Sequence, residues 1–294
     1  MSQTVSTKST IELNNDRPER SIDPGLFSGE FAQETLAQTK RWFIQLKRRP
    51  TTLIVGVAQP LMWLVLFGAL FHNIPQEFIG ATTYAQFLAA GIIVFTAFSG
   101  ALNSGLPIIF DREFGFLNRM LVAPLASRFS IVLASAIFII FMSIVQTVAI
   151  VVVSSFMGAG IPNLAGIVVM SLVILLLVLG FTMLSLGVSF AMPGHQELLA
   201  FIFLINLPLI FSSTALAPLE FMPRWLQWVA SLNPLSFAIA PIRHVYSNAS
   251  WSWQDVVLAA PWGDLTVLGC MAALAVFATI VGVLIRGVLR RGVT

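Results

Sequence analysis

Charge is scarce in this sequence, because only 10% of its 294 residues are Asp, Glu, Lys or Arg. An ordinary soluble domain contains about 25%. The single cysteine, Cys270, excludes an internal disulfide bond and a metal site built from cysteines. His72 and His244 lack neighbouring cysteines or clustered carboxylates, so no metal site is predicted.

Two further patterns are missing. The sequence contains no G-x-x-x-x-G-K-S/T phosphate loop, so this chain is not expected to hydrolyse ATP alone. Its basic residues flank apolar segments and do not form a face suited to nucleic acid. We therefore expect neither an enzyme nor a nucleic-acid-binding protein.

Long apolar runs dominate instead, since 57% of the residues are hydrophobic. A helix needs about 20 apolar residues to cross a bilayer. Six stretches without charge meet this length: residues 51–71, 84–110, 129–156, 164–192, 198–217 and 265–285. The predicted fold is an all-α polytopic membrane protein with six transmembrane helices in a domain of residues 50–294.

The distribution of Lys and Arg predicts the orientation. Of the 16 basic residues, all but Arg224 and Arg243 lie before the first run, between the second and third runs, or after the last. Cytoplasmic loops carry the excess of Lys and Arg in membrane proteins. Both termini are therefore predicted to be cytoplasmic.

A seventh apolar stretch, residues 225–242, reads WLQWVASLNPLSFAIAPI. As a span it would place the C-terminal arginines outside, and proline at 234 and 241 interrupts it. We interpret residues 219–247 as two short re-entrant helices that dip into the outer leaflet between spans five and six. An interfacial loop rich in tryptophan is the alternative.

The N-terminal region has two parts. Residues 1–27 are polar and expected to be a disordered cytoplasmic tail. Residues 28–49 place acidic residues first and basic residues last, with Phe31, Trp42 and Leu46 on one face. This pattern predicts an amphipathic helix on the inner membrane surface, held by its apolar face and by membrane lipids.

Five charged residues gather between the second and third runs, in FDREFGFLNRMLVAPLASRF. A helical projection separates apolar from charged side chains, which predicts an amphipathic cytoplasmic helix over 111–123 that ends before Pro124. Glu113 projects into the apolar side. It either pairs with the basic cluster at 40–49 or favours the dipole of its own helix. A soluble partner with a hydrophobic groove would fit this helix.

The segment DREFGFLNRMLVAPLASRFSIVLA resembles the signature of ABC-2-type permeases, the membrane subunits of ATP-driven exporters. Residues 218–243 resemble the re-entrant region before the last span of that family. The similarity is greatest to the daunorubicin-resistance branch, which has cyanobacterial and plastid relatives. The resemblance implies that an ATPase-coupling helix includes Arg112, Glu113, Phe114, Leu117, Arg119 and Pro124. It implies an outer gate at Pro223, Leu226, Asn233, Pro234 and Arg243.

The resemblance also implies partners and a place in the cell. Two copies of a separate ATPase would bind ATP and Mg, and this chain would hold no cofactor. A second permease subunit would complete a homodimer or a heterodimer. The dimer would export a hydrophobic or amphipathic substrate: a drug, lipid, pigment or glycan. The protein would lie in a bacterial inner membrane or a plastid membrane, with its termini in the cytoplasm or stroma.

Polar side chains inside the runs are several Ser and Thr and the amides, among them Gln59, Asn103, Gln146 and Asn206. The last three are candidates for a substrate path, although such amides also hold helices together. An ATP-independent transporter would be expected to carry charge in its spans. A lipid-modifying membrane enzyme would need clustered catalytic groups, and Ser189 has no base within reach.

Overall fold

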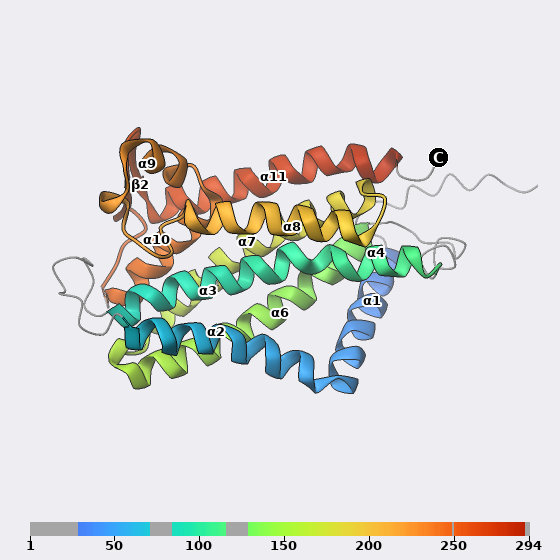
Figure 1. Cartoon of the computed structure of the whole chain (residues 1–294), viewed down its shortest axis with the longest axis horizontal. Helices are drawn as coiled ribbons and strands as arrows, with labels where there is room; N and C mark the ends of the chain where they lie inside the picture. Colours follow the sequence, from blue (N-terminus) through green and yellow to red (C-terminus); the bar gives the residue numbers. More distant parts are fainter. Residues whose placement is uncertain (1–28, 71–83, 116–128, 249, 292–294) are drawn as a thin grey trace, which may run out of the picture.

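The computed structural model describes residues 29–70, 84–115, 129–248 and 250–291, and shows long helices gathered along one axis (Figure 1). The long helices are α2 (Pro50–Leu70), α3 (Tyr84–Leu102), α6 (Phe129–Ser154), α7 (Leu164–Ala191), α8 (His195–Phe211) and α11 (Val267–Arg291). The predicted disordered tail, residues 1–27, lies outside the described residues.

The remaining elements occupy the two ends of this bundle. At the right-hand end of Figure 1, α1 (Gly29–Arg48) crosses the bundle steeply near α4 (Leu106–Glu113), which continues α3 through the 3₁₀ turn η2 (Asn103–Gly105). The other short elements are the π-helical η3 (Ser155–Ala159), the 3₁₀ turn η4 (Leu219–Phe221), α9 (Arg224–Ser231), α10 (Pro234–Ser247), β1 (Val256–Ala260) and β2 (Gly263–Thr266).

The helical membrane fold predicted from the apolar runs is confirmed. Among the described residues, five helical segments are long and apolar enough to cross a bilayer. They are Pro50–Leu70, Tyr84–Glu113, Ser130–Ala159, Leu164–Ala191 and Val267–Arg286. All five agree with predicted spans to within three residues at both ends.

The fifth predicted span, 198–217, differs most from the structure. Its helix, α8, has 17 residues and ends at Phe211, so it is about 26 Å long at 1.5 Å per residue. The hydrocarbon core of a bilayer is about 30 Å thick. Turns replace the helix after Phe211 because side chains outside α8 bind its last carbonyl groups.

The core follows α3, α7 and α11. The ring of Phe181 in α7 lies 4.6 Å from Phe98 of α3 and 5.0 Å from Phe277 of α11, between ring centroids. A Cβ at Gly180 would lie 2.7 Å from the Phe277 ring. The small residue therefore permits the close approach of α7 and α11.

Helix α1 packs on α6 through its aromatic residues. Trp42 stacks on Phe138 with centroids 5.6 Å apart, and Phe43 meets Phe141 edge-on at 4.9 Å. Phe31 is buried as well. The predicted amphipathic helix is thus present, and part of its apolar face covers α6; its contact with lipid stays a prediction.

The predicted short helices before the last span are present as α9 and α10. Residues 235–242 of α10 are all buried, packed among α3, α7 and α11. The alternative of an interfacial loop is therefore wrong for α10. An antiparallel hairpin of β1 and β2, with Ala260 opposite Gly263, follows α10 and was not predicted.

Candidate functional site

Three consecutive charged residues at the end of α4 bind three different parts of the molecule. The first, Asp111, pairs with Arg41 of α1, whose Nη2 lies 2.7 Å from the Asp111 Oδ2. This bond fixes the end of α4 to the helix that precedes the first span.

The second residue, Arg112, binds the turn between α7 and α8. Its guanidinium donates hydrogen bonds to the carbonyl oxygens of Met192 and Pro193, the latter at 2.9 Å. Carbonyl groups at the end of a helix lack partners within that helix and carry partial negative charge. Arg112 therefore caps the C-terminal end of α7.

The third residue, Glu113, sits over the start of α8. Its carboxylate accepts a hydrogen bond from the backbone N–H of His195 at 2.7 Å and lies 2.7 Å from the His195 Nδ1. His195 is the first residue of α8. An anion at this position satisfies a free N–H group and meets the positive end of the helix dipole.

We call these three residues and their partners the α4 clamp. Both interpretations of Glu113 from the sequence are wrong: Asp111, and not Glu113, pairs with the basic cluster, and Glu113 lies at the C-terminal end of its own helix. The dipole that favours Glu113 belongs to α8. His195 was missed as a partner, although a residue directly after Pro193-Gly194 carries the signal of a helix start.

The predicted cytoplasmic helix begins differently from the expectation. Asp111 to Glu113 form the last turn of α4, which starts at Leu106, and Gly115 has a φ of +72° that ends the helix. Phe114 is 81% exposed at this tip. The other residues predicted to couple to an ATPase, Leu117, Arg119 and Pro124, lie outside the part of the chain that the structure describes.

A serine of α7 holds the junction between α3 and α4. The Ser185 hydroxyl donates to the Leu102 carbonyl at 2.5 Å and accepts from the Gly105 N–H at 3.0 Å. A 3₁₀ segment within a helix often marks a hinge. Ser185 therefore supplies the hydrogen bonds that the α3–α4 junction gives up at η2.

The three candidate residues for a substrate path converge. Asn103, Gln146 and Asn206 line one cavity of about 300 Å³ between α2, α3, α6 and α8. Its other lining residues are Gly56, Gln59, Pro60, Phe95, Thr96, Ser99 and Gly100. None of these described residues is charged. We call this space the amide cavity.

The residues predicted as an outer gate hold helix ends together. Asn233, 4% exposed, donates from Nδ2 to the carbonyl oxygens of Leu209 and Ser212, at 2.7 and 3.1 Å. Its Oδ1 accepts from the Leu235 N–H at 2.9 Å, and Pro234 occupies the first turn of α10. Asn233 thus ends α8 and starts α10.

The remaining predicted gate residues lie in the same region. Pro223 is the residue before the first turn of α9, and Leu226 lies half-buried within that helix. Arg243 of α10 donates to the Thr214 carbonyl at 2.7 Å, and its guanidinium carbon lies 3.7 Å from the centroid of the Phe87 ring. These bonds tie α10 to α3 and to the turn after α8.

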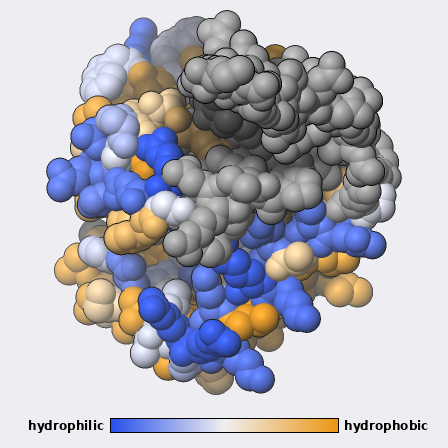
Figure 2. Space-filling model, turned by 90° about the vertical axis from the view of Figure 1, so that its right-hand side faces the viewer, coloured by the Kyte–Doolittle hydropathy of each residue, from blue (hydrophilic) through white to orange (hydrophobic). Residues whose placement is uncertain are grey.

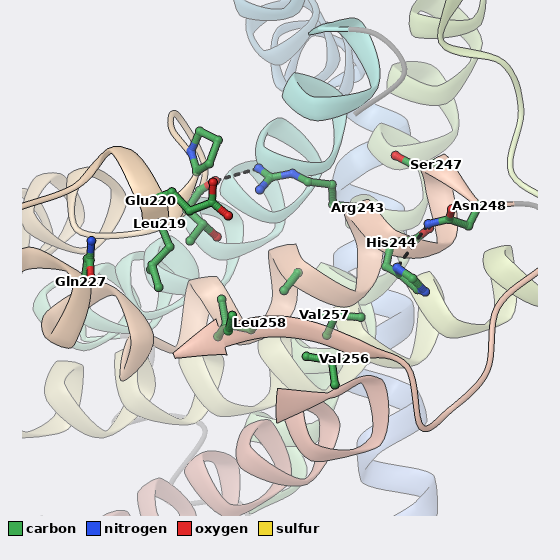
Figure 3. A pocket seen from close by; sticks show the side chains of 14 residues that line it. Leu219, Glu220, Gln227, Arg243, His244, Ser247, Asn248, Val256, Val257 and Leu258 are labelled. Carbon is green, nitrogen blue, oxygen red and sulfur yellow. Dashed lines mark hydrogen bonds between the residues drawn. The ribbon is translucent and has the colours of Figure 1, made fainter. Parts of the chain in front are cut away.

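Figure 3 shows Arg243 on the wall of a second cavity, of about 350 Å³, with His244 on the same helix. His244 Nε2 lies 2.9 Å from the Asp255 Oδ2. The backbone N–H of Ser252, followed by the His244 ring, lowers the pKa of the Asp255 carboxyl. The pair anchors the hairpin to α10.

Figure 2 shows hydrophilic side chains gathered on the end of the molecule that carries α1 and the tip of α4. The basic cluster of α1 belongs to this end.

Within the described residues, no group of three His, Cys, Asp or Glu side chains is placed to hold a metal ion.

Comparison with known proteins identifies the family. The ABC-2 type transporter profile matches residues 33–246. A putative transport permease, ycf38, from Porphyra purpurea is 53% identical over 260 residues, covering 88% of this chain and 89% of that protein. A probable doxorubicin resistance ABC transporter permease protein, DrrC, from Mycobacterium tuberculosis is 26% identical, covering 72% and 76%.

A third relative has a similar name. The daunorubicin resistance ABC transporter permease protein DrrB1 from Streptomyces coeruleorubidus is 27% identical over 241 residues, covering 79% of this chain and 82% of that protein. Members of this family generally work with an ABC ATPase subunit. The resemblance seen in the sequence is confirmed: the chain is a multi-pass transport permease that belongs to the ABC-2 type transporter family.

Proposed function

We propose that this chain is the permease subunit of an ATP-driven exporter, and that a separate ATPase drives it through the α4 clamp. The supporting observation is that Asp111, Arg112 and Glu113 join the tip of α4 to α1, α7 and α8. A push on α4 therefore reaches three helices at once. Exposed Phe114 offers an apolar contact for the partner.

The ATPase supplies the energy, with ATP and Mg bound in its own two copies. Its contact continues from Phe114 to Leu117, Arg119 and Pro124. The end of the molecule with the basic cluster faces the cytoplasm, or the stroma in a plastid. The abundance of Lys and Arg there supports this orientation.

A second copy of the chain completes the transport path. Gln59 of α2 and Asn103 of η2 are exposed at the amide cavity. Amides facing lipid lack hydrogen-bond partners, which is costly. A homodimer that meets along this flank covers both amides and joins two amide cavities into one route outward.

The substrate is hydrophobic or amphipathic. Apolar walls and uncharged polar groups in the amide cavity support this class. The names of two relatives, which refer to doxorubicin and daunorubicin resistance, agree with it. The membrane is a bacterial inner membrane or a plastid membrane.

The test is binding of an ATPase to the purified chain. Candidate ABC ATPases of the source organism should co-purify with it, and the complex reconstituted in vesicles should move substrate only with ATP. Replacing Phe114 by Ser should weaken this binding. Phe156→Ser is the matched control, because Phe156 is 86% exposed at the opposite end of the bundle. Transport without any ATPase would refute the proposal.

A further inference from the structure

The amide cavity has a hydrogen-bonding character that limits what it can hold. We propose that it binds an uncharged head group that donates hydrogen bonds, namely the hydroxyl groups of a polyol or sugar carried on an apolar chain. The inference rests on the proposed function, because it takes the amide cavity as part of the transport path.

Two of its amides have already used one of their two N–H donors. Asn103 Nδ2 donates to the Ser99 carbonyl at 2.7 Å, and Gln146 Nε2 donates to the Gly56 carbonyl at 2.9 Å. A backbone carbonyl only accepts hydrogen bonds, so the NH₂ end of each amide must face it. The oxygen ends of Asn103 and Gln146 are left as acceptors.

Two further polar atoms remain unsatisfied. The Oδ1 of Asn206 and the Oγ of Ser99 are buried and have no hydrogen-bond partner among the described residues. Buried polar groups are costly without partners. Three amide oxygens and a hydroxyl can thus accept hydrogen bonds from a bound molecule, and the remaining N–H groups of the amides can donate to it. Hydroxyl groups, which both donate and accept, fit such a site.

Charged head groups fit poorly. A phosphate or carboxylate anion cannot donate hydrogen bonds to the open amide oxygens, and no described lining residue is basic. An ammonium group finds acceptors, but no described lining carboxylate neutralises it. Burying an unpaired ion is far more costly than burying a hydroxyl with partners.

The size and walls of the cavity favour a single head group on an apolar chain. Its volume of about 300 Å³ is at the lower end of the range of about 300–1,000 Å³ for ligand pockets. Phe95 and Pro60 form apolar walls. The exposed Phe203 and Leu207 on α8 offer an apolar surface to the attached chain.

The test measures lipid binding by the full chain in nanodiscs, using native mass spectrometry. Three probes share the same acyl chains and differ in the head: a glucosyl diacylglycerol, a phosphatidylglycerol, and a diacyl trimethylammonium-propane lipid. The glucosyl lipid should bind more than about a hundredfold more tightly than either charged lipid. Equal or tighter binding of a charged lipid would overturn the proposal.

Two substitutions locate the site. Ser99→Ala and Asn206→Leu should each weaken binding of the glucosyl lipid by about three- to tenfold. Ser171→Ala is the matched control, because the Ser171 hydroxyl bonds its own helix at the Ile167 carbonyl and should leave binding unchanged. Unchanged binding in both cavity variants would place the lipid elsewhere and overturn the proposal.

A third substitution should change which lipid the site prefers, and therefore tests the proposal even if one of the other two variants fails to fold. Asn206→Asp keeps the shape of the side chain and adds a carboxylate, so it should shift preference toward the trimethylammonium lipid. An unchanged lipid preference in this variant would contradict the proposed site. Because these measurements need neither ATP nor an ATPase, a failure here is distinct from a failure to find ATP-driven export.

Discussion

At the scale of single residues, the α4 clamp concentrates the connections between the end of the molecule that carries α1 and the membrane helices. Adjacent side chains on one helical turn point in different directions, so each of the three charges reaches a different element. Removing one charge therefore loosens one connection and leaves the other two intact.

Glu113→Gln tests one of these connections. The substitution removes the charge that meets the start of α8 but preserves the shape of the side chain. We expect ATP hydrolysis to continue while export per ATP falls by about fivefold or more, since a coupling free energy typically corresponds to factors of about 5–150. The measurement is the ratio of transported probe to phosphate released in vesicles.

The matched control for this substitution is Glu197→Gln. Glu197 lies two residues after His195, in the first turn of α8, and is exposed. Its variant should keep the normal ratio. The role of Glu113 in coupling fails if both variants behave alike.

Asn233 connects the end of α8 to the start of α10. Asn233→Ala leaves the carbonyl groups of Leu209 and Ser212 without their buried donor, and should lower the free energy of unfolding by about 1–3 kcal/mol. Asn233→Asp should be intermediate, because a carboxylate still accepts from the Leu235 N–H. Apparent melting temperatures in detergent measure the order of stability of the parent and the two variants. An alanine variant as stable as the parent would contradict the prediction.

Sequence reasoning found these residues but not their partners. A cluster of charges in an apolar chain is visible by composition, and Asn-Pro marks a helix start. The partners Met192, Pro193 and His195 lie about 80 residues from the α4 charges. No local pattern specifies which of several distant polar groups a charge will meet.

At the scale of elements, the junction of α3 and α4 is the place where one helix becomes two. The 3₁₀ turn η2 gives up hydrogen bonds of the α-helical pattern, and Ser185 replaces them. Asn103 of the same turn lines the amide cavity. Movement of α4 about η2 would therefore change the cavity directly.

Ser185→Ala should weaken this junction. The Gly105 N–H and Leu102 carbonyl lose their partner in a buried site, which costs about 1–3 kcal/mol of unfolding free energy. Gly105→Ala should be worse, because its Cβ would lie 2.7 Å from the Ser185 carbonyl oxygen. Thermal unfolding in detergent is the measurement, and Ser171→Ala, which keeps η2 intact, should resemble the parent. Equal stability of all variants would rule out a structural role for Ser185.

The hydrophobic runs in the sequence predicted which segments form helices, but they were a poorer guide to where each helix ends. The runs fix where helices lie because a helix is the simplest way to satisfy a backbone in lipid. The end of α8 and the β1–β2 hairpin were missed. Both depend on contacts with other elements, such as Asn233 binding to Leu209 and Asp255 binding to His244.

At the scale of the whole molecule, the predicted orientation can be tested with introduced cysteines. Asp264→Cys, exposed in β2, should react with a membrane-impermeant maleimide added outside intact cells. Glu197→Cys, at the other end of the bundle, should react only after the cells are opened. The native Cys270 is buried and gives little background. The reverse pattern would invert the topology.

The packing of α1 also has a consequence for the order of assembly. Trp42 emerges from the ribosome nearly 100 residues before its stacking partner Phe138. At about 5–20 residues per second, this interval lasts roughly 5–20 s. During synthesis, therefore, the α1 aromatic residues must wait at the membrane or with a chaperone. Helix α1 is therefore not fixed by this packing until α6 has been synthesised.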